Sequence, residues 1–347
     1  MRIVQFKMPQ IGRRVGIVDG ETVRDITSIQ PQWERVIDIF HAADAAQASL
    51  TELLADTSHS TQPAELNYTE LLAAPPHGDQ PFLRAPLDHI DHHRILIAGT
   101  GLTHLGSMQS RDAMHSSTDD TVEPVTDSKK IFQMGVEGGK PVSGRRGVAP
   151  EWFYKGNGFN LRAHGETLDI PDFALDGGEE VEIVGCYVID SQGQPRRLGF
   201  AVGNEWSDHP TEKINYLYLA PSKLRQCAVG PELITDCDFS ELKLHCTVTR
   251  QGETIYDSGE LLSGEQHMSH SLANLEDHHF KFPQHRVSGD VHLHYFGTSK
   301  LSYGSRDWEY QDGDEICVTS DNLSATLRNR VQRPKVESVE PIQVLPI

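Results

Sequence analysis

Length and composition describe an acidic chain of ordinary globular make-up. It has 347 residues, 37% of them hydrophobic and 23% charged, which is enough for a large buried core. The formal net charge is −19 and the 31 Lys and Arg residues are scattered, which argues against nucleic acid and against an anionic membrane surface as partners. No apolar run approaches the ~18 residues of a membrane-spanning helix. An acidic chain of this kind handles an anionic substrate through a metal or through a few local Lys and Arg.

The N-terminal residues and the cysteines bear on localisation. The stretch MRIVQFKMPQIGRRVGIV has no apolar region followed by a small-residue cleavage site, so we expect no secretory signal. The five cysteines are odd in number and form no C-x-x-C pair, which is typical of free thiols in a reducing compartment. We therefore expect a cytoplasmic protein.

The first part of the chain predicts a small α+β unit. Residues 2–23 alternate like β-strands and turn at Asp19-Gly20. Apolar residues at helical spacing then predict a helix over 33–54. Five prolines between residues 63 and 86 mark a loop-rich segment. We expect a domain boundary there, with a small N-terminal α+β domain at 1–85 and the catalytic domain at 86–347.

The rest of the chain predicts a β-rich α+β fold. Short β-type runs follow one another at irregular spacing with few helix-length periodic segments between them, which disfavours a doubly wound sheet. These runs lie at residues 95–97, 181–189, 198–202, 242–248, 291–296 and 316–319. Residues 105–150 are polar and Gly-rich, and we expect them to form a long excursion with a short helix and a mobile lid.

Two glutamates in the block from Gly177 to Gly185 are candidate metal ligands. Side chains alternate faces on a strand, so Glu180 and Glu182 point the same way. Neighbouring carboxylates repel, and a Val- and Ile-rich strand is a costly place for them unless a cation lies between them. Carboxylate ligands favour Mg²⁺, with Mn²⁺ or Ca²⁺ possible, over zinc. A solvated strand face explains this motif equally well.

Three further blocks carry polar groups at the ends of β-type runs. Residues 198–204 form a strand that ends in a Gly-Asn turn, and Glu205 follows directly. Residues 220–231 form a basic loop that contains Lys223 and closes with Gly230-Pro231. Residues 289–298 run from Gly-Asp through a strand to Gly-Thr. Strand ends are places where ligands from separate segments can converge.

In this order the motifs resemble those of the fumarylacetoacetate hydrolase superfamily. They span roughly residues 95–330, about two thirds of the chain, and include Glu180/Glu182, Gly199-Phe200…Asn204-Glu205, Lys223…Gly230-Pro231, Gly289-Asp290, Gly297-Thr298, Gly313-Asp314 and Leu327-Arg328-Asn329. The resemblance implies a mixed β-roll preceded by a small N-terminal domain. Residues 203–209, Gly-Asn-Glu-Trp-Ser-Asp-His, resemble the AraD1/GguC-like sugar-acid branch.

The resemblance also implies a site and a reaction. Glu180, Glu182 and Glu205 would hold the metal, and Lys155, Lys223, Gly297 and Thr298 would bind a 2-oxo acid substrate. His104 and Lys223 would be the catalytic residues, with His104 in acid/base work. The metal would stabilise the enolate that forms when a C3 proton leaves. The expected enzyme is a Mg²⁺-dependent dehydratase of a 2-keto-3-deoxy sugar acid, working as a homodimer.

The sequence departs from the family pattern at three positions. Glu205 stands where the third ligand is usually Asp, and Lys223 lies about two residues closer to Gly230-Pro231 than expected. Ser107 stands where a Glu partner of His104 would be, which disfavours a His–Glu pair that activates water.

Other functions stay open at this stage. The enolate also serves C–C hydrolysis of an acylpyruvate or diketo acid, and a non-catalytic relative would bind a sugar acid without turnover. His292 and His294 would share a strand face, as in the metal sites of cupin-like isomerases. Gly99-x-Gly101 hints at a dinucleotide loop, but the third glycine is too distant and no parallel βαβ unit follows.

Overall fold

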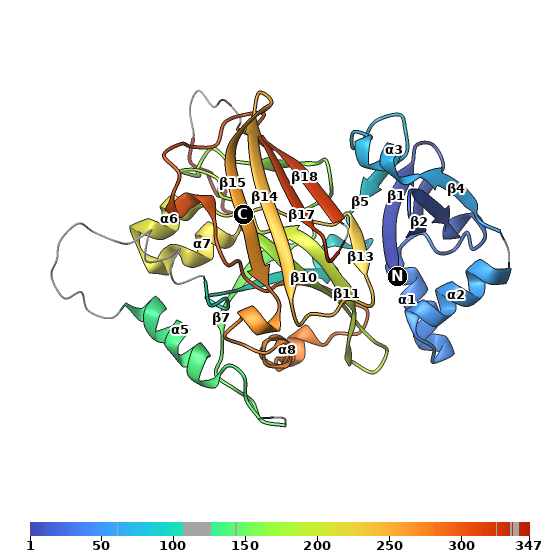
Figure 1. Ribbon diagram of the computed structural model, residues 1–347, viewed down its shortest axis with the longest axis horizontal. Coiled ribbons are helices and arrows are strands. Elements are labelled where there is room, and N and C mark those ends of the chain that lie inside the picture. The colour runs from blue at the N-terminus through green and yellow to red at the C-terminus, as the bar shows by residue number, and fades with distance from the viewer. Residues whose placement is uncertain (61, 107–125, 143, 324, 334, 336–339) are drawn as a thin grey trace.

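A computed structural model describes residues 1–60, 62–106, 126–142, 144–323, 325–333, 335 and 340–347. The N-terminal elements lie to one side of the molecule (Figure 1). They are β1 Arg2–Met8, β2 Gly12–Asp19, β3 Thr22–Asp25, α1 Val36–Ala46, α2 Leu50–Ser60, β4 Ala64–Asn67, α3 Tyr68–Ala73 and β5 Phe82–Arg84.

The remaining elements are mostly strands. They are β6 Ile95–Gly101, α5 Asp127–Gly138, β7 Glu151–Asn157, β8 Leu161–Arg162, β9 Thr167–Asp169, β10 Val181–Ile189, β11 Pro195–Asn204, α6 His209–Ile214, α7 Leu219–Lys223, β12 Cys227–Val229, β13 Glu232–Ile234, β14 Leu242–Arg250, β15 Glu253–Ser263, α8 Leu272–Phe280, β16 Val291–Tyr295, β17 Glu315–Ser320 and β18 Ala325–Gln332. The predicted β-rich α+β fold is confirmed.

Two sheets form the body of the protein. The larger has the order β4-β3-β2-β1-β13-β11-β10-β16-β6-β7, and the smaller has the order β15-β14-β17-β18-β9. The smaller sheet lies at the front of the molecule in Figure 1. Apolar residues of β10 and β11 pack against β14, β17 and β18 in one hydrophobic core. Alternate residues of β10, Val184 and Val188 among them, pack into a second core on the other face.

The N-terminal elements are joined to the rest through the larger sheet. Strand β1 pairs antiparallel with β13, with Arg2 opposite Ile234 and Val4 opposite Glu232. Arg2 also donates to Glu232 at 2.7 Å. The domain boundary near residue 85 stays a prediction, and one hydrogen-bonded sheet crosses it.

The helix predicted over 33–54 is two helices. Gln47 adopts a left-handed conformation with φ of 55° and ends α1. Ser49 then starts α2, because its hydroxyl accepts from the Glu52 amide at 3.2 Å and its own amide donates to Glu52 at 2.9 Å. This reciprocal pair of hydrogen bonds is a capping box, which marks the start of a new helix.

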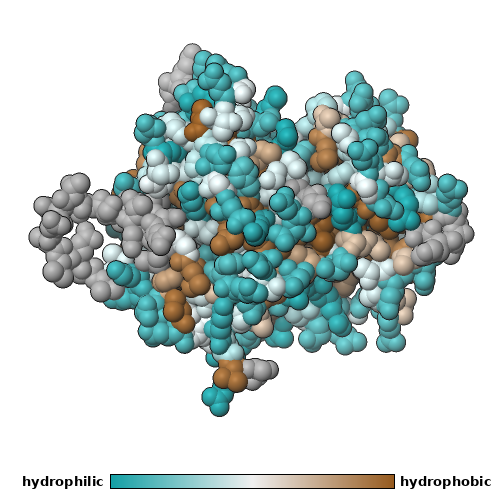
Figure 2. All heavy atoms as spheres, viewed as in Figure 1, coloured by the Kyte–Doolittle hydropathy of each residue, from teal (hydrophilic) through white to brown (hydrophobic). Residues whose placement is uncertain are grey.

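The predicted excursion at 105–150 contains the helix α5, and residues 107–125 lie outside the described part of the chain. Among the described helices, none has the length and apolar character needed to cross a membrane. Hydrophilic side chains cover most of the face in Figure 2, with small separate hydrophobic areas between them.

Candidate metal centre

Three carboxylates converge where the antiparallel pair β10–β11 ends. Glu182 lies in β10 opposite Gly203, and Glu180 precedes the strand. Glu205 directly follows β11, and its amide donates to the Glu180 carbonyl at 2.8 Å. One carboxylate oxygen from each of the three residues lies within 4.8 Å of the others. All three side chains are buried, so the strand pairing forces three acidic groups together inside the protein.

The triad contains unpaired acceptors. Glu182 Oε1 and Glu205 Oε2 are buried without a hydrogen-bond partner among the described residues. Burial, followed by repulsion from Glu205 and Glu180, raises the pKa of Glu182 well above its usual value. Unpaired buried oxygens and repelling carboxylates cost free energy that a divalent cation would offset. A set of three carboxylates fits Mg²⁺, which prefers hard oxygen ligands.

Two buried lysines adjoin the triad. Lys223 donates to Glu180 Oε1, lies 3.5 Å from Glu205 Oε1, and has its Nζ 4.8 Å from the Phe153 ring centroid. Burial lowers the pKa of Lys223, but Glu180 and Glu205 more than compensate and raise it above its usual value. Lys155 Nζ lies 3.3 Å from Glu205 Oε1 and donates to the Trp206 carbonyl. Burial lowers the pKa of Lys155. Both lysines predicted to bind substrate therefore lie beside the carboxylates.

Glu180 has two further partners that sequence reasoning missed. His209 Nε2 donates to Glu180 Oε1 at 3.0 Å. Asn204 accepts from the Glu180 amide at 3.1 Å. Burial opposes ionisation of Glu180, yet Lys223 and His209 hold its pKa below the usual value. Glu180 is therefore an ionised carboxylate with a fixed orientation.

Strand β7 forms another wall of the site. Its alternate residues Glu151, Phe153 and Lys155 are buried, whereas Tyr154 between them is exposed. A side chain on Gly99 of β6 would contact the Phe153 ring and come within 3.3 Å of Glu205 Oε2. A side chain on Gly101 would collide with Glu151 Oε2. The two glycines that suggested a dinucleotide loop instead leave room for carboxylates on one face of β6.

Glu151 is a functional candidate that sequence reasoning missed. Gly99 lies beside Glu205 and Gly101 lies beside Glu151. Because the two glycines are two residues apart on one strand, the two carboxylates lie roughly 7 Å apart along it. Glu151 Oε1 also accepts from Tyr216 Oη at 2.7 Å. The signal was available in the alternation Glu151-x-Phe153-x-Lys155, which predicts all three side chains on one face.

His104, Gly297 and Thr298 lie near the triad in different ways. The Gly297 amide donates to Glu182 Oε2 at 2.7 Å, so it orients one carboxylate of the triad. Thr298 is 9% exposed and donates to the Lys300 carbonyl at 2.9 Å. His104 is fully buried, with Nε2 2.9 Å from Ser263 Oγ, and burial lowers its pKa to about 3. Its expected partner position, Ser107, lies outside the described residues. The roles predicted for these three residues stay predictions.

The histidines of β16 form a separate buried cluster. His292 Nδ1 lies 2.9 Å from His279 Nε2 of α8, and the His294 and His279 ring centroids lie 4.4 Å apart. Within the described part of the chain, three convergent metal-ligand atoms occur only at the glutamate triad. The geometry therefore gives no support to a cupin-like site at His292 and His294.

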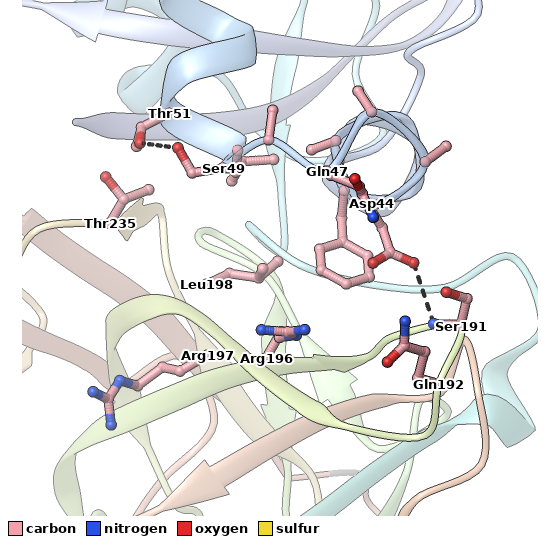
Figure 3. Close-up of a pocket in the computed structure, with 16 residues that line it drawn as sticks. Asp44, Gln47, Ser49, Thr51, Ser191, Gln192, Arg196, Arg197, Leu198 and Thr235 are labelled. Carbon is pink, nitrogen blue, oxygen red and sulfur yellow. Dashed lines mark hydrogen bonds between the residues drawn. The ribbon is translucent and has the colours of Figure 1, made fainter.

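A cleft of about 840 Å³ lies elsewhere, between the α1–α2 connection and the β10–β11 hairpin (Figure 3). Asp44 spans it by accepting from the Ser191 amide at 3.2 Å. None of the three glutamates lines this cleft.

The comparisons with known proteins agree with this geometry. No family model matches the chain. A Haloferax volcanii protein named as a probable 2-keto-3-deoxyxylonate dehydratase is 30% identical over 139 residues, which cover 39% of this chain and 45% of that protein. The match thus spans less than half of that relative.

Two solved structures share the fold over nearly the whole chain. A 2-keto-3-deoxy-D-arabinonate dehydratase, solved in complex with magnesium and 2,5-dioxopentanoate, superposes with a TM-score of 0.68 at 17% identity, covering 97% of this chain and 100% of that one. The fumarylacetoacetate hydrolase of Exiguobacterium antarcticum superposes with a TM-score of 0.60 at 15% identity, covering 96% and 100%.

Fold and site together define a β-rich α+β protein in which three buried carboxylates converge at the end of an antiparallel strand pair, as a candidate metal centre. The chain has the fold of the fumarylacetoacetate hydrolase superfamily. The resemblance predicted from the ordered motifs is confirmed at the level of the fold.

Proposed function

We propose that the chain is a Mg²⁺-dependent dehydratase of a 2-keto-3-deoxy sugar acid. The observation that carries the proposal is the convergence of Glu180, Glu182 and Glu205 with unpaired buried oxygens. Support comes from the shared fold with a dehydratase solved with magnesium and 2,5-dioxopentanoate. The partial similarity to the Haloferax protein points to the same class of substrate.

The residues around the triad suit an anionic 2-oxo acid. A bound Mg²⁺ would polarise the keto group and stabilise negative charge as it develops on the keto oxygen. Lys223, beside Glu180 and Glu205, offsets the negative charge of the triad and would attract the substrate carboxylate. Lys155 lies 3.3 Å from the same Glu205 oxygen that Lys223 approaches. Buried Phe153 excludes water from this wall of the site.

Dehydration requires a proton to leave C3 and another to reach the departing C4 hydroxyl. Glu151 would serve both transfers, and the neighbouring positions of Gly99 beside Glu205 and Gly101 beside Glu151 on β6 support this role. It would take the C3 proton as base and return a proton to the hydroxyl, which leaves as water. Tyr216 Oη donates to Glu151 Oε1, and Glu151 Oε2 faces Gly101. His104, which the sequence predicted as the acid/base residue, forms a hydrogen bond with Ser263 instead.

C–C hydrolysis is the alternative reaction at the same centre. It needs a base that activates water, and the base predicted from the sequence was His104. Full burial and a pKa of about 3 make His104 a poor proton acceptor near neutrality. A non-catalytic binding protein is the other alternative, and the intact set of Glu180, Glu182, Glu205 and Lys223 favours turnover over binding alone.

One experiment separates these functions. Purified protein is offered 2-keto-3-deoxy pentonates and hexonates against a series of acylpyruvates, with Mg²⁺ and with EDTA. We expect Mg²⁺-dependent release of water from the deoxy sugar acids only. Cleavage of acylpyruvates would favour the hydrolase, and binding of deoxy sugar acids without turnover would favour the non-catalytic protein. Turnover that survives EDTA would contradict the metal assignment.

We further propose a homodimer. Large apolar side chains on and next to α6 and α7 are exposed, with Ile214 64%, Leu217 82% and Leu224 49% exposed. Such a group of exposed apolar residues is typical of a protein interface. Light scattering after gel filtration should give twice the chain mass of 38.7 kDa, and Leu217→Glu should shift the mass toward one chain.

A cytoplasmic location is also proposed. All five cysteines are free, and Cys186, Cys227 and Cys246 are buried. Free thiols are typical of a reducing compartment. Detection of the protein in a membrane or secreted fraction of its own cells would contradict this.

A further inference from the structure

His209 reaches the metal centre because its helix begins at a fixed place. Asp208 caps α6 by accepting from the Thr211 amide at 3.2 Å, and Arg225 donates to Asp208 at 3.2 Å. The ring of His209 is buried and lies against Gly178, where any Cβ would collide with it. The capped start of α6 and the contact with Gly178 together place His209 beside Glu180.

Tyr303 packs against the His209 ring. The two rings stack with centroids 5.2 Å apart and an interplanar angle of 28°. Tyr303 belongs to a short 3-10 helix, Ser302–Gly304, and the guanidinium of Arg306 lies 5.6 Å from its ring centroid. Arg306 in turn donates to Asp176 at 2.7 Å.

The segment that carries Tyr303 is fastened to the strand of the metal ligands. Glu179, directly before Glu180, accepts from the Ser302 amide at 2.6 Å and from its hydroxyl at 2.8 Å. The same carboxylate accepts from Tyr310 Oη at 2.6 Å. Glu179 thus faces away from the metal centre and ties the Tyr303 segment to it. This explains why three glutamates stand so close together at 179, 180 and 182.

We propose that His209 and Tyr303 are positioning residues for the metal ligand Glu180. Tyr303 holds the imidazole in the plane from which Nε2–H donates to Glu180 Oε1. Lys223 donates to the same oxygen. Both contacts engage Oε1, so they orient the carboxylate and reserve Oε2 for the cation. The inference rests on the cation-binding part of the proposed function and is independent of the reaction. Groups that orient metal ligands are typically worth about 10- to 100-fold in metal affinity.

The test is Mn²⁺ binding by calorimetry and by electron paramagnetic resonance, on the full-length protein without substrate. His209→Phe keeps a ring but removes the donor, and His209→Gln keeps a donor at the same reach. Tyr303→Leu removes the stacking ring, and Tyr303→Phe retains it. We expect the two variants that lose the interaction, His209→Phe and Tyr303→Leu, to bind Mn²⁺ about 10- to 100-fold more weakly than the parent. His209→Gln and Tyr303→Phe should stay close to the parent, with the parent's resonance spectrum.

A matched control is His245→Phe. His245 also contacts a carboxylate, Asp257, at 2.7 Å, but it lies on the smaller sheet and is partly exposed. Its loss should leave Mn²⁺ affinity unchanged. Circular dichroism and thermal unfolding establish that each variant is folded. His209→Phe and Tyr303→Leu change different residues, so either one tests the positioning role if the other does not fold.

The outcomes are distinguishable from a failure of the proposed function. If the parent binds Mn²⁺ tightly and His209→Phe and Tyr303→Leu bind it equally well, the positioning role is overturned while the metal centre stands. Equal weakening in the rescue variants also overturns it, because packing alone would then explain the effect. If the parent shows no saturable Mn²⁺ binding, the metal centre and the positioning role fall together.

Discussion

The carboxylate of Glu151 occupies the space that a side chain at position 101 would need. The two residues are register partners in the antiparallel pair β6–β7. A Cβ on Gly101 would overlap Glu151 Oε2. Glu151 can therefore keep this position only if residue 101 is glycine. A substitution of Gly101 tests whether Glu151 transfers protons.

Gly101→Ala should lower kcat on the deoxy sugar acid by about 100-fold, because a displacement of about 1 Å at a reacting group has effects of that size. Metal affinity should be little changed, since Glu151 is not one of the three metal ligands. Steady-state kinetics and Mn²⁺ calorimetry measure the two effects. Gly78→Ala is the matched control, because its added methyl group would meet only Pro75. Equal kcat in both variants would contradict the role of Glu151.

Tyr216→Phe tests the same carboxylate through its hydrogen bond. Loss of the 2.7 Å hydrogen bond to Glu151 Oε1 weakens the orientation of the carboxylate by about 1 kcal/mol, which corresponds to a roughly fivefold fall in kcat. KM should stay near the parent value because Tyr216 contacts the carboxylate and not the metal ligands. A purely structural role for Tyr216 would lower the free energy of unfolding and leave kcat unchanged.

Glu182→Gln should separate metal binding from folding. Burial and the neighbouring Glu205 and Glu180 disfavour its ionised form, so an uncharged amide relieves repulsion. In EDTA the variant should be at least as stable as the parent in urea unfolding. Mg²⁺ should stabilise the parent by about 2.7 kcal/mol at 100 times its Kd and the variant by much less. Equal stabilisation of both proteins by Mg²⁺ would exclude Glu182 as a ligand.

Much of this site could be predicted from local patterns. The alternation of Glu180 and Glu182 with Val181 and Ile183 predicted two carboxylates on one strand face, and a solvated face explained this pattern equally well. Glu205 at the end of the next strand favoured a carboxylate centre. Pairing of the two strands, which the sequence did not specify, is what brings the third carboxylate to the first two. The resemblance to the family supplied the order in which these segments combine.

Other parts depend on contacts between segments far apart in the chain. Glu151 enters the site because β7 pairs with β6 at the edge of the larger sheet. The alternation along residues 151–155 shows that Glu151, Phe153 and Lys155 share a face, but it does not show which strand that face meets. His209 stands 29 residues from Glu180 and meets it only through the start of α6. The break at Gln47 was a local signal that the helical periodicity of residues 33–54 concealed, because the apolar spacing continues across the capping box at Ser49.

The last prediction concerns acid stability, which the buried histidines should control. Burial lowers the pKa of His104, His292 and His294 to about 3 in each case. The unfolded chain has the usual histidine pKa of about 6.5 and therefore binds more protons than the native state between these values. Stability then rises with pH in this window and is lost as pH falls below about 6.5, at roughly 2 kcal/mol per histidine between pH 7 and pH 5.

His294→Phe tests this directly, because both ring nitrogens of His294 lack partners among the described residues and Phe296 already packs beside it. The variant should lose about 2 kcal/mol less than the parent between pH 7 and pH 5, since one proton fewer is taken up on unfolding. Urea unfolding at a series of pH values measures the slope. If the free energy of unfolding fell equally with pH in parent and variant, His294 would have the same pKa in the folded and unfolded states. The acid sensitivity would then come from other groups.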